Sequence, residues 1–257
     1  MRYMVFLKKE LMEIFKTYKI YVVPAVFLFF GFTSPLITKY TPELIKSLSN
    51  SASSGFKITL TEAPKFSDSY AQFFKNLNQI GLIVLILAFM GMVVDEKVKG
   101  SAAMVLTKCL SRTQFIVSKF ISSVFLFTCS FALGALGCIC YNYALFQTFY
   151  HKYLLLAFLM FWVYGLLMIS ITVFASTISK SHMMSAVIAF AGYISSSVSV
   201  MTPYIDKYTP GTLSNLSTTL LTGGNTISDV TIPLIVTIAL TMGFLWGSIA
   251  LFKKQEI

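Results

Sequence analysis

Charged residues and histidine are absent from the six longest apolar runs of the sequence. None of these runs contains Asp, Glu, Lys, Arg or His. Proton relays, ion-coupled carriers and charged channel filters place such groups inside the membrane despite their energetic cost. Intramembrane hydrolases need acids, a serine-based dyad or metal ligands. The absence therefore argues against all of these classes.

Nucleotide-binding and metal-binding patterns are missing as well. No stretch has the form G-x-x-x-x-G-K-[ST], which cradles phosphates. The four cysteines show no zinc-site spacing, and the two histidines fall in different loops. We therefore expect no metal, no cofactor and no catalysis in this chain. If the chain transports a substrate, the energy comes from another polypeptide.

The composition is that of a membrane protein. Hydrophobic residues make up 56% of the 257 residues and charged residues only 12%, with a mean hydropathy of +0.76. The apolar runs are continuous rather than alternating, which predicts helices of about 20 residues rather than a β-barrel. We predict an all-α membrane protein with one domain, 1–257, and six transmembrane helices. The predicted spans cover about 20–38, 77–94, 120–146, 153–178, 183–202 and 230–252.

The N-terminal segment 2–19 is predicted to form an amphipathic helix at the membrane surface. Its apolar residues recur at helical spacing with charged residues between them: Met4, Leu7, Leu11, Ile14, Phe15 and Tyr18. The alternative is a charged N-terminus that only sets topology.

The distribution of Lys and Arg predicts the orientation. Six spans place both termini on one side, together with thirteen of the 20 Lys and Arg residues, so that side is expected to be cytoplasmic. An outer loop, 39–76, then contains a possible helix start at Thr41-Pro42-Glu43 and another at "SDSYAQFF". The helix of "SDSYAQFF" would extend the second span outward from the membrane. A short helix ending at Gly223-Gly224 is expected before the last span. The net charge of +10 is thus topogenic, with membrane lipid rather than nucleic acid as its partner.

The predicted cytoplasmic loop 95–119 has the most distinctive local pattern, "DEKVKGSAAMVLTKCLSRTQFIVSKF". Gly100-Ser101 can break the chain and begin a new helix, in which Val105, Leu106 and Cys109 share one face. "SRTQ" is a capping-box pattern, in which Ser111 bonds the Gln114 amide and the Gln114 side chain reaches back. The pattern predicts a short amphipathic helix parallel to the membrane, whose apolar face needs another surface to cover it.

This loop resembles the segment after the second span in type-2 ABC exporter permeases. The residues that match that family's pattern are Glu96, Lys97, Gly100, Ser101, Leu106, Ser111, Arg112 and Lys119, whereas Cys109 replaces a usual proline. The resemblance implies an exporter permease in a bacterial cell membrane, with both termini cytoplasmic. It also implies a second permease subunit, identical or homologous, and two separate ATPase subunits that bind ATP and magnesium.

In that family the loop is a coupling helix that docks into the ATPase. The resemblance therefore implies an ATPase-binding site made of Glu96, Lys97, Gly100, Ser101, Ala102, Val105, Leu106, Leu110, Ser111 and Arg112. The alternative is an ordinary basic loop. The substrate expected from the family is an amphipathic or antimicrobial peptide, with a drug or an ion as alternatives. The competing function is an ATP-independent membrane protein, such as a sensor partner or an intramembrane enzyme.

Small and hydroxylated residues within the spans are weaker candidates. Ser195, Ser196 and Ser199 could line a translocation path, or could bond their own helix carbonyls. Gly243 and Gly247 have the spacing that lets helix backbones approach closely, and Ser130, Gly134 and Cys138 form a similar ridge. Either set could pack between subunits or within one.

Overall fold

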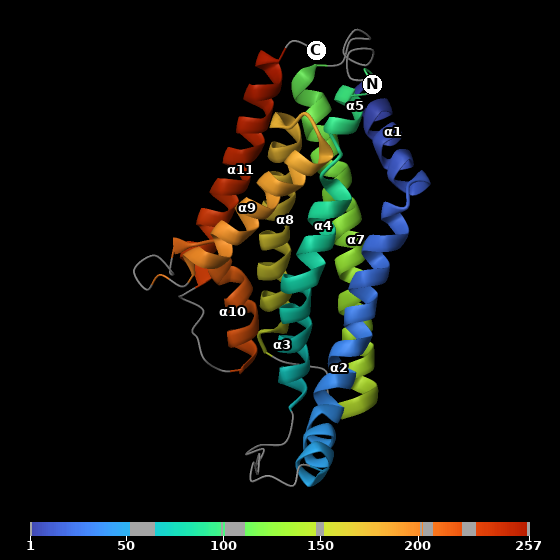
Figure 1. Cartoon of the computed structure of the whole chain (residues 1–257), viewed down its shortest axis with the longest axis vertical. Coiled ribbons are helices and arrows are strands. Elements are labelled where there is room, and N and C mark those ends of the chain that lie inside the picture. Colours follow the sequence, from blue (N-terminus) through green and yellow to red (C-terminus); the bar gives the residue numbers. More distant parts are fainter. Residues whose placement is uncertain are drawn as a thin grey trace.

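The computed structural model describes residues 2–51, 65–98, 100, 111–147, 152–200, 202, 208–222 and 230–255. Every regular element in these ranges is a helix, as the sequence predicts. The long helices lie side by side in an elongated bundle (Figure 1). Both termini, α1 (Arg2–Lys16) and α5 (Val94–Val98) lie at one end, called here the upper end as drawn. The opposite end is the lower end.

Five helical segments are long and apolar enough to cross a membrane, judged over the described residues. They are Lys19–Glu43, Phe66–Val98, Arg112–Phe146, Leu154–Ile178 and Thr231–Lys254. The predicted fifth span, 183–202, corresponds to α9 (His182–Ser199), which is not among them. Its 18 residues span about 27 Å, less than a bilayer core of about 30 Å. His182 and five serines also reduce its apolar content. The described helices therefore show a multi-pass protein without confirming six crossings.

The first two predicted spans are extended by helices into the predicted outer loop. α2 (Lys19–Ser51) continues through Pro42, so no new helix starts at Thr41. Proline within a helix costs a hydrogen bond and strain, but the helix-forming residues after Pro42 continue the helix. On the other side of the loop, α3 (Phe66–Asn76) contains "SDSYAQFF" and continues into the second span, which confirms that prediction.

The second span is interrupted twice. A π-helix, η1 (Leu77–Gly81), separates α3 from α4 (Leu82–Phe89), and a turn over 90–93 separates α4 from α5. By contrast, α7 (Arg112–Phe146) has 35 uninterrupted residues and packs along α2. Interruptions of this kind are bending points, and π turns are frequent at functional sites.

α8 (Leu154–Ile178) forms the centre of the bundle. Its most apolar stretch is 67% buried, whereas that of α11 (Thr231–Lys254) is only 11% buried. α11 packs against α8, and α10 (Gly211–Thr222) packs against α3 and α8 in the lower half. α10 is the short helix expected before the last span, and it ends next to Gly223 as predicted. The exposed apolar faces of α2 and α11 suit a lipid environment.

The core between α2, α3, α7 and α8 is rich in phenylalanine. Phe27, Phe74, Phe131 and Phe161 are buried within it, and the last three are linked by ring contacts. α2 and α7 touch through their backbones, because a β-carbon at Gly134 would lie 2.7 Å from the Phe27 carbonyl oxygen. The ridge of Ser130, Gly134 and Cys138 is buried and therefore packs within this subunit.

Candidate functional site

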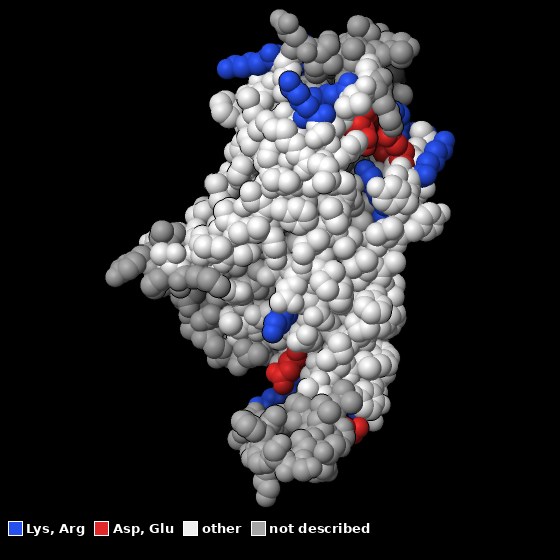
Figure 2. All heavy atoms as spheres, in the orientation of Figure 1, with Lys and Arg blue, Asp and Glu red and all other residues white. Residues whose placement is uncertain are grey.

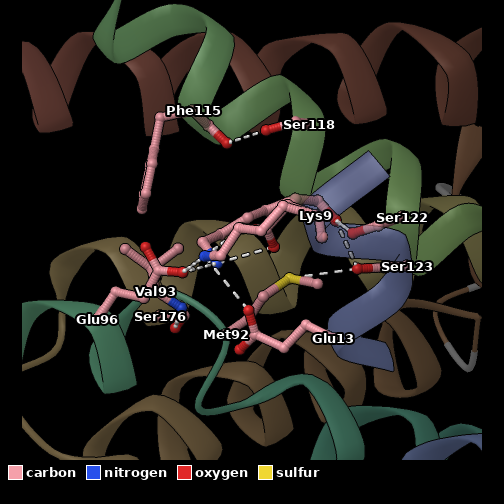
Figure 3. Close-up of polar contacts among 12 residues, drawn as sticks. Lys9, Glu13, Met92, Val93, Glu96, Phe115, Ser118, Ser122, Ser123 and Ser176 are labelled. Atoms are coloured by element: carbon pink, nitrogen blue, oxygen red, sulfur yellow. Dashed lines mark hydrogen bonds and ion pairs between the residues drawn. The ribbon is translucent and has the colours of Figure 1, made fainter. Parts of the chain in front are cut away.

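The upper end contains a group of charged side chains contributed by three helices. Lys119 Nζ of α7 lies 2.9 Å from Glu96 Oε1 of α5 and 3.0 Å from Glu10 Oε2 of α1. Lys9 Nζ lies 3.2 Å from Glu96 Oε1, 3.3 Å from Glu13 Oε2 and 3.4 Å from Glu10 Oε1 (Figure 3). We call Lys9, Glu10, Glu13, Glu96 and Lys119 the charge cluster. It joins α1, α5 and α7.

The centre of the charge cluster is removed from solvent. Lys119 is only 2% exposed, Glu10 4% and Glu96 6%. Charges at this depth persist when paired, because an uncompensated buried charge costs several kcal/mol. Burial by itself lowers the pKa of Lys9, but its attraction to Glu96, Glu10 and Glu13 outweighs burial and raises that pKa above its usual value. Lys9 is therefore held in its charged form.

Carboxylates gather here in a way that could hold a cation. Oxygens of Glu10, Glu13 and Glu96 lie within 4.8 Å of one another. The ammonium groups of Lys9 and Lys119 already lie between them and balance most of their charge. The arrangement is thus an ion-paired joint between helices rather than a metal site.

The position of Glu10 follows from the phase of α1. Phe6, Glu10 and Ile14 recur at every fourth residue, and all three are buried. The Phe6 ring lies 5.9 Å from that of Phe115 in α7, and Phe115 stacks on Phe252 of α11 at 5.1 Å. Rings on one turn and the carboxylate on the next dock α1 onto α7. Whether this helix also lies at a membrane surface remains a prediction.

The turn over 90–93 brings α5 to the charge cluster. Two backbone amides at the end of this turn are bound by α8: the N–H groups of Val93 and Val94 donate hydrogen bonds of 3.0 and 3.3 Å to Ser176 Oγ. Asp95 pairs with His182 at 2.7 Å, which ties α5 to the start of α9. Glycine at position 91 leaves room for this pair, because a β-carbon there would lie 2.8 Å from both the Asp95 carboxylate and the His182 ring.

Cations on either side of the loop bind the ends of other helices. Lys97 Nζ donates to the Thr177 and Ser179 carbonyls at the end of α8. Arg112 Nη1 donates to the carbonyls of Phe252, Lys253 and Gln255 at 3.0, 3.0 and 2.6 Å, at the end of α11. Positive charge stabilises a helix C-terminus because terminal carbonyls lack intrahelical partners.

The loop between Val98 and Ser111 is therefore anchored at both of its ends. Glu96 connects it to α1 and α7, Lys97 to α8, and Arg112 to α11. A movement of the loop relative to the bundle would strain contacts to four helices. Such an arrangement suits the transmission of motion between the loop and the membrane-spanning helices.

The structure describes only part of the predicted ATPase-binding site. Gly100 adopts a positive φ of 68°, as a glycine break permits. Ser111 accepts from the Gln114 amide while the Gln114 side chain accepts from the Ser111 amide, which confirms the capping box. Ser101, Ala102, Val105, Leu106 and Leu110 lie outside the described residues. Binding of an ATPase by these residues stays a prediction.

The side chains of Glu96, Lys97 and Arg112 bond to other helices of this chain. Sequence reasoning assigned them to a partner and missed Lys9, Glu10 and Lys119 as their buried counterparts. The one available signal for a buried acid was that Glu10 lies four residues from both Phe6 and Ile14, which places it on the apolar face of the helix.

The predicted path and packing residues have separate positions. Ser195, Ser196 and Ser199 each donate to a carbonyl of their own helix, and Ser196 also bonds the Tyr164 hydroxyl at 2.9 Å. Ser195 is exposed, whereas Ser196 is buried. A β-carbon at Gly243 would point into open space, whereas one at Gly247 would contact Phe174 of α8. Gly247 therefore packs within the subunit.

Replacing Arg112 with leucine is expected to loosen the end of α11. The change removes three charge-assisted hydrogen bonds, so amide hydrogen exchange over 250–255 should become about tenfold faster. Lys253→Leu is the matched control, since its backbone carbonyl still accepts from Arg112. Equal exchange in the two variants would show that the arginine contacts do not hold this helix end.

The fold and the site define a multi-pass helical membrane protein with an ion-paired joint at one end. The family model described as ABC-2 family transporter protein matches residues 4–257, and the chain belongs to this family. The uncharacterized transmembrane protein YxlG of Bacillus subtilis (strain 168) is 30% identical over 131 residues. That alignment covers 51% of this chain and 50% of the relative, so the chain spans about half the relative's length. The description of the matched family is that of transporter proteins.

Proposed function

We propose that this chain is the permease subunit of an exporter driven by ATP that a separate ATPase subunit hydrolyses. The observation that carries the proposal is the anchoring of the loop between Val98 and Ser111 to α1, α7, α8 and α11. In this proposal the ATPase docks on residues 101–110. ATP and magnesium bind to that partner, and this chain contributes no catalytic group.

The loop transmits motion in both directions. When the docked ATPase changes shape, the displaced loop moves Glu96, Lys97 and Arg112, and their partners on the four helices must follow or exchange contacts. Lys119 lies at the centre because it bonds α1 and α5 at once. Substrate-induced movement of the helices would reach the ATPase through the same contacts.

The proposed topology has six crossings, with the upper end in the cytoplasm. α1 and the end of α11 both lie at that end, which supports an even number of crossings (Figure 1). Five helices qualify individually, and α9 followed by α10 would complete the sixth crossing. Basic side chains outnumber acidic ones in the upper end as a cytoplasmic face requires, with Lys97, Arg112, Lys180, Lys253 and Lys254 among them.

The proposed transporter contains two such subunits and two ATPase chains. The exposed apolar faces of α2 and α11 offer surface for a second permease subunit as well as for lipid. The absence of charged residues from the predicted spans suits an amphipathic peptide better than a small ion. We propose such a peptide as the substrate and export as the direction.

Coexpression of this chain with an ABC ATPase from the same genome, followed by native mass spectrometry, tests the proposal. The expected mass is that of two permease and two ATPase chains, and ATPase activity should rise when substrate is added. A permease that never associates with an ATPase, yet folds, would favour the ATP-independent alternative and remove the proposal.

A further inference from the structure

The lower half of the bundle contains a polar recess that the loop and the charge cluster do not involve. It has a volume of about 350 Å³ and lies between α3, η1 and α10. Its polar lining comprises Asp68, Gln72, Lys75, Asn78, Ser214, Asn215 and Thr218. Figure 2 shows a few charged side chains of both signs in the lower half, on a largely uncharged surface.

Carboxamides dominate this recess. Gln72, Asn78 and Asn215 each present a donor and an acceptor, which is the pairing that a peptide bond requires. The Asn78 Oδ1 atom is buried and has no hydrogen-bond partner among the described residues. A buried acceptor without a partner is costly, so turning the Asn78 carboxamide toward a donor of a bound ligand would gain that contact.

The π turn of η1 holds Asn78 in place. Its backbone carbonyl accepts a 2.8 Å hydrogen bond from the Tyr193 hydroxyl of α9. On α3, the Gln72 side-chain amide donates to Asn76 Oδ1 at 3.1 Å, and this bond does not use the Gln72 side-chain oxygen as an acceptor. Gln72, Asn78 and Asn215 thus belong to helices, namely α3, η1 and α10, rather than to a loop.

The two charged groups have a defined separation. Asp68 and Lys75 are seven residues apart on α3 and line the same recess, about 10 Å apart along the helix axis. An extended peptide advances about 3.3–3.6 Å per residue, so three residues span this distance. Asp68 also caps α3 by accepting from the Lys65 amide at 3.0 Å, and its remaining lone pairs can accept from an ammonium group.

We propose that this recess binds a short zwitterionic peptide of about three residues, or the free end of a longer one, with its ammonium group at Asp68 and its carboxylate at Lys75. Asn78 and Asn215 pair with the peptide bonds between them. The inference deepens the proposed function and rests on it, because only the proposed topology places the recess on the outer side of the membrane. The peptide would occupy the recess as it leaves the transporter.

The test uses the purified full chain in phosphatidylcholine nanodiscs, without an ATPase, and trialanine as the probe. Isothermal titration calorimetry should show saturable binding of trialanine. N-acetyl-trialanine amide has the same length but neither terminal charge, and it should bind at least tenfold more weakly. Glycerophosphoethanolamine carries the same two charges on a lipid headgroup, and it should not compete.

Two variants locate the binding. Ala71→Phe, on the recess wall, should fill the hollow and abolish binding. Lys75→Gln should weaken binding about three- to fivefold, because the lysine is exposed and its charge is screened. Lys152→Gln changes another exposed lysine of the lower end, outside the recess, and should leave binding unchanged. All three variants should keep the parent's melting temperature.

The inference is overturned if the blocked peptide binds as well as trialanine, if Ala71→Phe leaves binding intact, or if glycerophosphoethanolamine displaces the peptide. The last outcome would make the recess a lipid-headgroup site. Because no ATPase is present, these outcomes are independent of copurification. If the chain binds trialanine but never associates with a coexpressed ATPase, only the proposed function fails. If it associates with an ATPase but does not bind trialanine, only the peptide site fails.

Discussion

Replacing Lys119 with methionine should destabilise the folded chain by about 3–5 kcal/mol. Lys119 is 2% exposed and pairs with both Glu10 and Glu96, which are themselves buried. Removal of the ammonium leaves two carboxylates in a water-poor site with only Lys9 nearby, and breaking a buried ion pair has a cost of this order. Equilibrium unfolding in mixed micelles, followed by tryptophan fluorescence, measures the difference from the parent.

Lys9→Met provides the matched control. Lys9 touches the same carboxylates, but its side chain is 46% exposed, so its removal should cost less than about 1 kcal/mol. Combining Lys119→Met with Glu10→Gln and Glu96→Gln should recover most of the lost stability, because no buried charge then remains. If Lys119→Met costs no more than Lys9→Met, the charge cluster does not hold α1, α5 and α7 together.

Replacing Leu106 with aspartate should abolish association with the ATPase and, with it, transport. Leu106 belongs to the predicted apolar face of residues 101–110, where a charge would be desolvated in the docking groove without a partner. Copurification with the ATPase and transport into inverted vesicles should fall together, by tenfold or more. The permease itself should still insert and fold, because the anchors at Lys97 and Arg112 remain.

Lys108→Ala is the control for this change. The predicted helix phase places Lys108 away from the apolar face, so the substitution should reduce transport far less. Should Leu106→Asp transport as well as the parent, the segment is a topogenic loop and the coupling role is wrong. Loss of folding in Leu106→Asp would place the leucine in the bundle instead, which also contradicts docking.

Local sequence patterns predicted the local structures well. The capping box of Ser111 and Gln114 involves residues three apart, and the outward continuation of the second span through "SDSYAQFF" depends on helix propensity alone. Composition also sufficed for the helical class, because long apolar runs leave few other folds in a membrane. Family membership could be predicted from the loop, because its glycine, serine and arginine lie at the spacing that is typical of the family.

Long-range contacts could not be predicted in this way. Lys119 meets Glu10 across 109 residues of sequence, and neither side chain carries a local sign of its partner. In the sequence, Lys119 was matched to the family's loop pattern and counted among the basic residues that set topology, and Glu10 was one of the charged residues between the apolar positions of segment 2–19. The helix start at Thr41 was wrong because proline is favoured in a first turn but also tolerated within a long helix.

The second span is interrupted and the third is continuous, so the third span is the stiffer of the two. The second span bends at η1 and again over 90–93, so a push at its upper end is absorbed as curvature. α7 is unbroken over 35 residues, about 52 Å, and carries Arg112 and Lys119 near one end. Near its other end, the Leu145 carbonyl accepts from Lys39 of α2. α7 thus acts as a rigid lever arm, and a tilt of a few degrees at the loop becomes a displacement of several ångströms at the far end.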